Sequence, residues 1–284
     1  MKSITMNDGI TIPTLGLGVY LVRDVAECER SVLTALEAGY RLIDTAAVYG
    51  NERAVGRAVA ASSVPRSELF ITTKIWVTQF GYERTRAAIS EALERLGTEY
   101  IDLLLLHQPV GDYLGSWKAL EEAVAAGTVK SIGLSNFTVD DLAKVLAVAT
   151  IVPAVNQVER HPYSQQLALS AFHAKHSIVG EAWFPIGHGS KELLAEPIFA
   201  TLAAKYGKSV VQTILRWHMQ TGWVAIPKST DAAHIRQNLD IFDFELDAAE
   251  LASIAAIDRA RPMFRLPRWA LAIGTRLTRV RLLP

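Results

Sequence analysis

Short apolar runs rich in Leu, Ile and Val recur along the chain, and each is followed by a longer stretch with apolar residues at helical spacing. The runs predict strands that begin near Leu15, Leu42, Leu69, Ile101, Ser131, Ala154, Ile178 and Val224. Strands that alternate with helices indicate parallel βαβ units, whose strands are buried on both faces. The run Ile101 to Leu106 shows this character, because almost every position in it is apolar.

The stretches between the strands have recognisable helix ends. Asp24 is a predicted N-cap with Glu27 three residues later, and Gly39 ends the helix that follows. Gly97 ends a second helix in the same way. Comparable patterns predict helices over about 51–60, 113–126, 139–148, 165–175, 197–206 and 209–220, the last two hinged at Gly207.

Eight such units over about 220 residues predict a (β/α)₈ TIM barrel rather than an open doubly wound sheet, which more often has five or six strands. A hairpin precedes them, with Ser3 to Thr5 turning at Asn7-Asp8-Gly9 into Thr11 to Pro13. We expect residues 1–14 to plug the bottom of the barrel. We also expect one α/β domain over residues 1–284.

Composition agrees with a protein that has a large core. Half of the residues are hydrophobic and 20% are charged, which argues against disorder. The 29 basic and 29 acidic side chains balance, so no overall field favours nucleic acid. The lone Cys28 excludes an internal disulfide, and neither a signal peptide nor a membrane-spanning run is present in the sequence. We therefore expect a cytoplasmic protein, and a monomer because no interface stripe is evident.

The basic tail, residues 259–284, needs a separate explanation. Residues 261–284 contain six arginines and no acid, which leaves the rest of the chain mildly acidic. Three roles stay open for this tail: a poorly ordered extension, a lid on the pocket, or a segment that touches acidic membrane surfaces or a partner. A lid would use Met263, Phe264 or Trp269.

Candidate chemistry follows from the residues that close the strands. Reactive groups of such barrels gather at the carboxyl ends of the strands. Asp44 closes the second strand and Tyr49 follows it, while Lys74 closes the third strand and His107 the fourth. Each residue alone has an ordinary reading, such as a helix cap or a surface cation. Their equivalent positions in successive units predict a single site.

A Tyr with Lys, His and Asp has a definite chemical use. An unperturbed phenol has a pKa of about 10, and a nearby ammonium and imidazole lower the cost of negative charge on its oxygen. Tyr49 can then donate a proton, with Asp44 orienting Lys74, while His107 helps to position a carbonyl oxygen. This site suits protonation of an oxygen while a hydride arrives at the neighbouring carbon.

Several motifs, in their order and spacing over about residues 10–258, resemble the aldo-keto reductase family and, in overall pattern, its bacterial members near 2,5-diketo-D-gluconate reductases. The motifs are Ile-Asp44-Thr-Ala-Ala-Val-Tyr49-Gly-Asn-Glu, Ile-Thr-Thr-Lys74, Leu-Leu-Leu-His107-Gln-Pro, Ser-Ile-Gly-Leu-Ser135-Asn136-Phe, Pro-Ala-Val-Asn-Gln157-Val-Glu and Ile-Pro-Lys228-Ser229. The resemblance implies an NADP(H)-dependent reductase of small-molecule aldehydes and ketones, with Tyr49 as general acid.

The same resemblance implies a set of cofactor contacts. The nicotinamide amide would be bound by Ser135, Asn136 and Gln157 and its ring stacked on Trp183. The loop beside the pyrophosphate would contain Ile186, Gly187 and Gly189. The adenosine end would meet Lys228, Ser229, His234, Gln237 and Asn238.

The chain departs from the family pattern at several of these positions. His234 stands where an arginine normally covers the adenosine phosphate, and Gln237 replaces a common glutamate, so NAD(H) use is also open. Gln108 replaces a tryptophan in the substrate pocket. Arg160 replaces an apolar residue, either as a surface substitution, which we favour, or as a group that attracts an acidic substrate.

Three further expectations complete the sequence reading. Tyr20 and Trp76 are expected to join Trp183 in an aromatic wall of the pocket. We expect no metal, because His173 and His176 have the only suggestive spacing and no ligating partner nearby. Two alternatives to a reductase remain: a regulatory barrel that senses the nicotinamide, and a Schiff-base aldolase with Lys74 as nucleophile.

Overall fold

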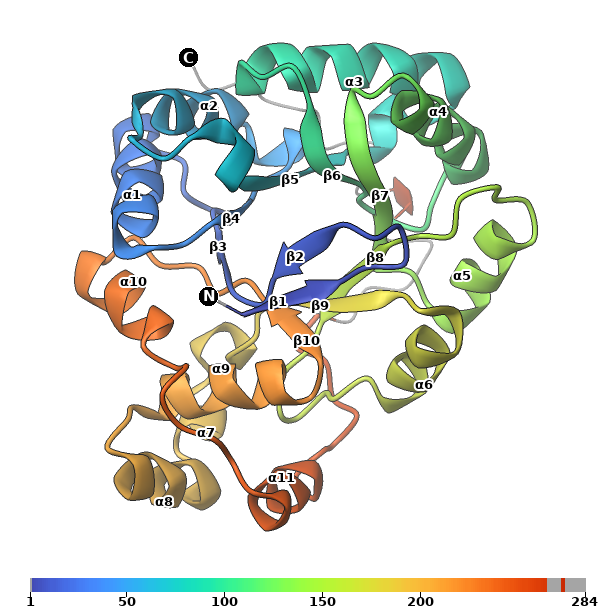
Figure 1. The fold of residues 1–284 in the computed structure, drawn as a ribbon. Helices are drawn as coiled ribbons and strands as arrows, with labels where there is room; N and C mark the ends of the chain where they lie inside the picture. Colours follow the sequence, from blue (N-terminus) through green and yellow to red (C-terminus); the bar gives the residue numbers. More distant parts are fainter. Residues whose placement is uncertain (1, 265–271, 274–284) are drawn as a thin grey trace.

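The computed structural model describes residues 2–264 and 272–273. A parallel eight-stranded sheet curves into a barrel, and helices surround it (Figure 1). Each strand begins within two residues of the expected position, so the predicted TIM barrel is confirmed. The barrel strands are β3 (Gly16–Gly18), β4 (Leu42–Asp44), β5 (Phe70–Ile75), β6 (Ile101–Leu106), β7 (Val129–Ser135), β8 (Val155–Glu159), β9 (Val179–Trp183) and β10 (Trp223–Ala225).

Neighbouring strands of the barrel are also neighbours in the chain, from β3 through to β10. Parallel bridges between Leu15 and Ala225 and between Gly18 and Lys228 join the last strand to the first. Every residue of β4, β5 and β6 is buried. Burial on both faces explains why these strands are mostly apolar and show no regular alternation with polar residues, although buried polar side chains such as Asp44, Lys74 and Asp102 interrupt them.

The helices cover the outside of the barrel (Figure 1). The longer helices are α1 (Val25–Ala38), α2 (Glu52–Ala61), α3 (Tyr82–Leu96), α4 (Tyr113–Ala125), α5 (Val139–Leu146), α6 (Leu167–His176), α8 (Pro197–Tyr206), α9 (Val210–Gln220), α10 (Ala232–Leu239) and α11 (Ala248–Ala255). The short ones are α7 (Lys191–Leu194) and the 3₁₀ turns η1 (Ala47–Tyr49), η2 (Arg66–Glu68), η3 (Val77–Gln79) and η4 (Gly187–Gly189). No helix among the described residues is long and apolar enough to span a bilayer.

The ends of α1 form as the sequence predicts. The Asp24 side chain accepts a hydrogen bond of 2.7 Å from the Glu27 amide, which satisfies a free donor of the first turn. At the other end Gly39 has a φ of 110°, a left-handed conformation that favours glycine. The predicted pair of helices on either side of Gly207 is also confirmed as α8 and α9.

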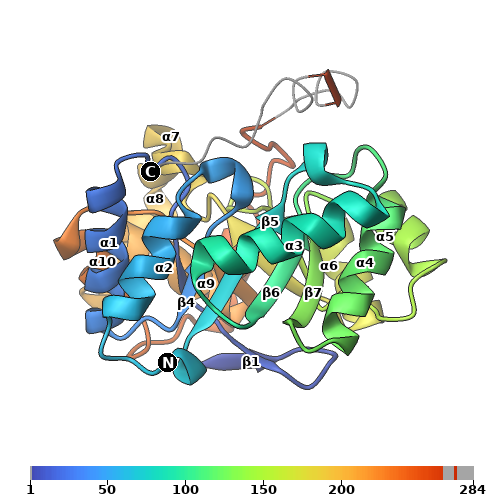
Figure 2. The ribbon, with the colours of Figure 1, turned by 90° about the horizontal axis from the view of Figure 1, so that it is seen from above.

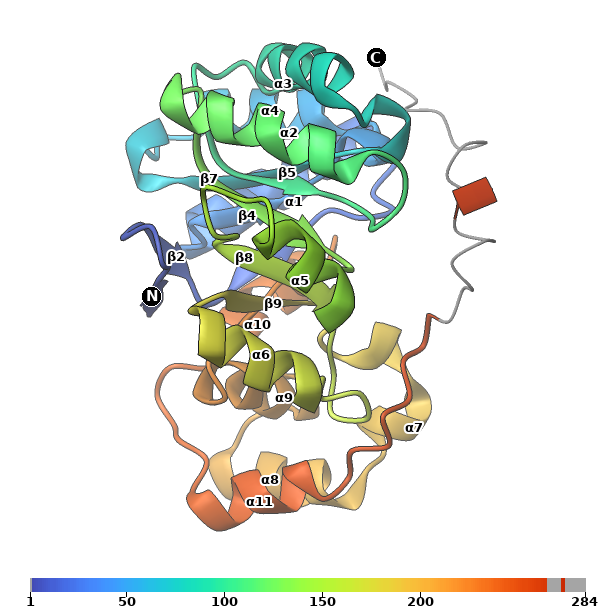
Figure 3. The ribbon, with the colours of Figure 1, turned by 90° about the vertical axis from the view of Figure 1, so that its right-hand side faces the viewer.

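The N-terminal hairpin closes one end of the barrel, as expected. Strands β1 (Ser3–Thr5) and β2 (Thr11–Pro13) pair antiparallel, and Met6 and Ile12 pack into an apolar cluster with Leu103 inside the barrel. Figure 2 shows the hairpin at one end, and Figure 3 shows residues 259–264 crossing near the other. Any opening to the barrel interior must therefore be at the end where the strands finish.

His173 is buried on α6, and its Nε2 lies 3.1 Å from the Asn156 Nδ2. Among the described residues no three His, Cys, Asp or Glu side chains form a group able to hold a metal ion. Burial lowers the pKa of His173 to about 4. The folded protein therefore keeps this imidazole neutral at pH values where an unfolded chain would protonate it.

We predict that this difference makes the protein less stable in acid. Between about pH 6.5 and pH 4 the unfolded state binds more protons, so unfolding free energy falls as pH falls, by about 2 to 3 kcal/mol from this residue. Urea unfolding at pH 7 and at pH 4.5 measures the loss. His173→Gln should show a smaller difference between the two pH values than the wild type, and an equal difference would contradict the assignment.

Candidate active site

The carboxyl ends of three adjacent strands bring Asp44, Lys74 and His107 together, as the sequence predicted. The Lys74 side chain is fully buried, and its Nζ donates to Asp44 Oδ1 at 2.7 Å and Oδ2 at 2.8 Å. A third hydrogen bond of 2.8 Å goes to the Thr45 carbonyl oxygen. The three ammonium hydrogens thus each have an acceptor, which is the condition under which a buried cation is tolerated.

Tyr49 lies at the end of η1, above this ion pair. The Lys74 Nζ is 5.1 Å from the centre of the Tyr49 ring, and the His107 ring is 5.7 Å away in an edge-on arrangement. Tyr20 lies 5.0 Å away on another side of the same ring. The four residues expected to form a site therefore converge in the structure.

The electrostatics of Tyr49 differ from the expectation. Desolvation, with smaller contributions from Asp44, Tyr20 and Glu181, raises the pKa of Tyr49 well above its usual value. The nearby ammonium does not reverse this, because Asp44 compensates its charge. Burial and Lys74 lower the pKa of His107 well below its usual value. The resting site thus combines a protonated phenol with a neutral imidazole.

Residues that follow Tyr49 brace the site from outside. Asn51 accepts the Thr45 hydroxyl at 2.7 Å and donates to the carbonyl oxygens of Val19 and Val22. This ties the loop after β3 to the residue whose carbonyl receives Lys74. Glu52 is also buried and pairs with Arg95 on α3. The segment Tyr49 to Glu52 is therefore fixed by contacts with the loop after β3 and with α3.

A row of polar side chains crosses the adjoining strands. Ser135 on β7, Gln157 on β8 and Glu181 on β9 are neighbours in strand register, and all three are buried. Gln157 Nε2 donates to Asp44 Oδ2 and to Glu181 Oε2, both at 2.8 Å. The sequence analysis did not identify Glu181, which lies in the middle of β9 and not at the end of an apolar run as Asp44 does.

The side chains of Asn136 and Trp183 are hydrogen-bonded to each other beside this row of polar residues. Asn136 has a left-handed backbone with φ of 68°, and its Nδ2 donates to the His107 carbonyl at 3.0 Å and to Ser135 Oγ at 3.2 Å. Its Oδ1 accepts the Trp183 indole N–H at 2.9 Å. Asn136 thus uses its whole amide within the protein, whereas no hydrogen bond among the described residues uses the Ser135 hydroxyl hydrogen or Gln157 Oε1.

The other expected cofactor residues lie in two loops. Ile186, Gly187 and Gly189 form the turn around η4 after β9, where both glycines have positive φ. The second set follows β10, the neighbour of β9 in the sheet, and lies in the loop after β10 and on α10. In it Lys228, His234 and Gln237 are exposed, Ser229 is half-buried and Asn238 is buried. Lys228, His234 and Gln237 are accessible to a charged ligand, because their side chains are exposed to solvent.

More aromatic side chains gather around the site than the sequence analysis expected. Trp76 lies edge-on to His107 with ring centres 5.0 Å apart, and Tyr20 contacts Tyr49. Gln108 follows His107 and is half-buried. Phe184, which the sequence analysis missed, has its ring 4.8 Å from Trp183 and 6.2 Å from Tyr20. The backbone φ of Phe184 is 49°, which is unusual for a bulky residue. The spacing of apolar residues in the sequence does not point to this side chain.

The start of the C-terminal tail is fastened over these aromatic side chains. The backbone amides of Met263 and Phe264 both donate to the Glu159 carboxylate, at the end of β8. The Phe264 ring lies 6.2 Å from that of Trp183, and 6.1 Å from Phe184. Of the three roles left open, a lid through Met263 and Phe264 fits these contacts. Trp269 lies outside the described residues.

Arg160 corrects one expectation. It is not a surface residue: its side chain is buried and its guanidinium lies 4.0 Å from the centre of the Trp217 ring and 4.7 Å from that of Trp223. It also contacts His218 Nδ1 at 2.9 Å. Nor is it free to attract an acidic substrate. The reason is that Trp217 and Trp223, which lie far along the chain, pack against the guanidinium. Their rings let an arginine occupy a position where an apolar residue is usual.

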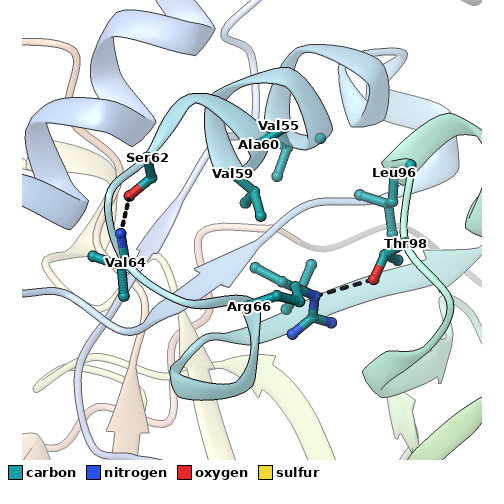
Figure 4. Close-up of a pocket in the computed structure, with 11 residues that line it drawn as sticks. Val55, Val59, Ala60, Ser62, Val64, Arg66, Leu96 and Thr98 are labelled. Atoms are coloured by element: carbon teal, nitrogen blue, oxygen red, sulfur yellow. Dashed lines mark hydrogen bonds between the residues drawn. The ribbon is translucent and has the colours of Figure 1, made fainter.

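One further hollow lies away from this chemistry. It is a surface pocket of about 300 Å³ between the end of α2 and the end of α3, with Arg66 at its edge (Figure 4). The start of β5 borders it, at the opposite end of that strand from Lys74. The Arg66 Nε donates to the Thr98 hydroxyl at 3.1 Å. Because it holds none of the converging groups, this pocket is not the candidate active site.

A barrel with a Tyr over a buried Lys–Asp pair and a neighbouring His defines an oxidoreductase that acts on carbonyl groups. The chain belongs to the aldo/keto reductase family, whose model matches residues 15–259. An aldo-keto reductase of Mycolicibacterium smegmatis is 44% identical over 268 residues, 93% of this chain and 96% of that protein. A morphine 6-dehydrogenase of Pseudomonas putida is 44% identical, with 90% of each chain covered.

A solved structure agrees with this assignment. The crystal structure of an aldo-keto reductase from Bombyx mori in complex with NADP has a TM-score of 0.88 and 35% identity. The match covers 94% of this chain and 96% of that one. The family relationship, which the sequence motifs had suggested, is therefore established, and with it a class of enzymes that uses a nicotinamide cofactor.

We predict that the Asp44–Lys74 pair is needed for stability. Lys74→Met leaves the buried Asp44 without its cation, which should lower the free energy of unfolding by about 3 to 5 kcal/mol in urea unfolding at pH 7. Adding Asp44→Asn removes the uncompensated charge and should restore much of the loss. Single and double variants of equal stability would contradict this account.

Proposed function

We propose that this enzyme reduces aldehydes or ketones of small molecules to alcohols with NADP(H), using Tyr49 as the general acid. The observation that carries the proposal is the position of the Tyr49 ring above the Lys74–Asp44 pair and beside His107. A phenol kept protonated by burial is the form that an acid requires.

The residues of the site have separate roles in this reaction. A bound nicotinamide would supply the hydride that reaches the carbonyl carbon. Tyr49 gives its proton to the carbonyl oxygen, and Lys74, held by Asp44, stabilises the negative charge that then develops on the phenol. His107 is neutral, so it orients the carbonyl oxygen by hydrogen bonding and does not compete as the acid.

The nicotinamide carboxamide suits the polar row at β7 and β8. Such an amide needs an acceptor for its NH₂ and a donor for its oxygen. Gln157 Oε1 and the Ser135 hydroxyl offer these groups on neighbouring strand positions. The Trp183 ring, fixed by Asn136, would stack on the pyridine ring.

The pocket wall indicates which substrates fit. Trp76, Tyr20, Phe184 and Phe264 surround the entrance, which favours carbonyl compounds with an apolar or planar body. The relative named for morphine 6-dehydrogenation supports interconversion of an alcohol and a ketone on such a body. Gln108 adds one polar group at the rim.

The two alternatives to a reductase are less well supported. A Schiff-base aldolase needs a free amine, whereas Lys74 is fully buried and donates three hydrogen bonds. A nicotinamide-sensing barrel would bind the cofactor without turnover, and it would have no use for a proton donor aligned with an imidazole. Borohydride trapping with substrate tests the first alternative.

We predict that Tyr49→Phe lowers kcat at least about 100-fold while the Kd for NADPH changes less than about twofold. Loss of NADPH absorbance with aldehydes, α-dicarbonyls and keto-sugars measures turnover, and quenching of tryptophan fluorescence measures binding. Tyr100→Phe is the matched control, because it removes a tyrosine hydroxyl just before β6, at the other end of the barrel. Turnover that survives Tyr49→Phe would mean that another group is the acid. Binding without turnover in the wild type would favour the sensor.

The adenosine end yields a second prediction. His234 is exposed at the start of α10, and its imidazole lies 3.9 Å from Asp231. An arginine there can form two charged hydrogen bonds to a phosphate. We expect His234→Arg to tighten NADPH about threefold to tenfold and NADH little, as measured by fluorescence titration. Equal tightening of both cofactors would show that position 234 does not contact the 2′-phosphate.

A further inference from the structure

Glu181 is a buried acid that the proposed reaction does not use. It lies in the middle of β9 with no exposed surface, and its Oε2 accepts one hydrogen bond from Gln157. Its Oε1 has no hydrogen-bond partner among the described residues. Ala182 and Val179 beside it on the strand are apolar, so an aliphatic side chain would be the simpler occupant of this position.

The contacts of Gln157 explain what the acid does. A primary amide has two N–H hydrogens, and here one is given to Asp44 Oδ2 and the other to Glu181 Oε2. An inverted amide would place Gln157 Oε1 against the Asp44 carboxylate that pairs with Lys74, and it would lose both hydrogen bonds donated here. The two acids therefore fix the amide in one orientation, with its carbonyl oxygen directed away from both.

The charge balance of the layer supports this reading. Lys74 is the cation paired with Asp44, and Glu181 makes no ion pair among the described residues. Burial and the nearby Asp44 raise the pKa of Glu181 above its usual value. Glu181 Oε2 thus serves Gln157 alone, whereas Asp44 Oδ2 is shared between Gln157 and Lys74.

We propose that Glu181 is a positioning residue for the cofactor: together with Asp44 it holds both amide hydrogens of Gln157 and so presents the Gln157 carbonyl oxygen to the nicotinamide carboxamide. This inference rests on the proposed function, because it requires that the site binds a nicotinamide. It also joins the carboxamide site to the proton-donor site, since one Gln157 side chain contacts Asp44 and faces the cofactor.

The test compares two cofactors that differ only at the carboxamide. We would titrate the purified protein with NADPH and with its analogue that has an acetyl group in place of the carboxamide, following tryptophan fluorescence. The analogue cannot donate a hydrogen bond to Gln157. The ratio of the two Kd values therefore reports how well Gln157 Oε1 is presented, independently of turnover.

Glu181→Leu should reduce the preference for NADPH about threefold to tenfold, since one anchor of the amide is lost. Glu181→Gln is the matched control: it has nearly the same shape and still offers an oxygen to Gln157, so it should keep the wild-type ratio. Glu181→Met replaces the Leu variant if that protein does not fold, as judged by its thermal transition. An unchanged ratio in a folded Leu or Met variant would overturn the inference, as would an equal loss in Glu181→Gln.

A double-variant cycle separates positioning from general packing. In a Gln157→Ala background the amide is gone, so Glu181→Leu should leave the ratio unchanged. A further drop in that background would show that Glu181 acts by another route. Failure of the proposed function gives a different result, because wild-type protein would then bind neither cofactor. That outcome would overturn both proposals together.

Discussion

A buried lysine is tolerated in the barrel only because Asp44 faces it. Removing two charges from water is costly, and a close pair with every donor satisfied is what offsets that cost. Lys74 meets the condition with two bonds to Asp44 and one to the Thr45 carbonyl. The support then spreads outward, since Asn51 holds Thr45 and Gln157 holds the second face of Asp44. The geometry around Tyr49 follows from this one requirement.

Burial also shifts the pKa values of two neighbouring residues of the site, Tyr49 and His107, in opposite directions. Desolvation favours the uncharged form of any group, so it keeps a proton on Tyr49 and removes one from His107. A tyrosine in water would hold its proton at neutral pH in any case, but an imidazole would be partly charged there. Burial thus leaves a protonated phenol beside a neutral imidazole.

The sequence predicted the barrel well because its strands are continuous apolar runs and its helices have clear caps. It predicted Asp44, Lys74 and His107 because each stands where an apolar run stops. Glu181 was missed because it lies inside its strand, with Ala182 and Trp183 after it. Other features depend on contacts between distant parts of the chain, which no local pattern carries. Arg160 was misread because Trp217 and Trp223, its aromatic partners, lie far along the sequence.

The N-terminal hairpin has a kinetic consequence. Met6 and Ile12 seal the barrel floor, so the interior opens only at the end where Glu159 fastens the tail. Under the proposed function, cofactor and substrate would share this single mouth, so the one seated deeper would leave after the one nearer the entrance. The sealed floor would then make the order of product departure a matter of depth.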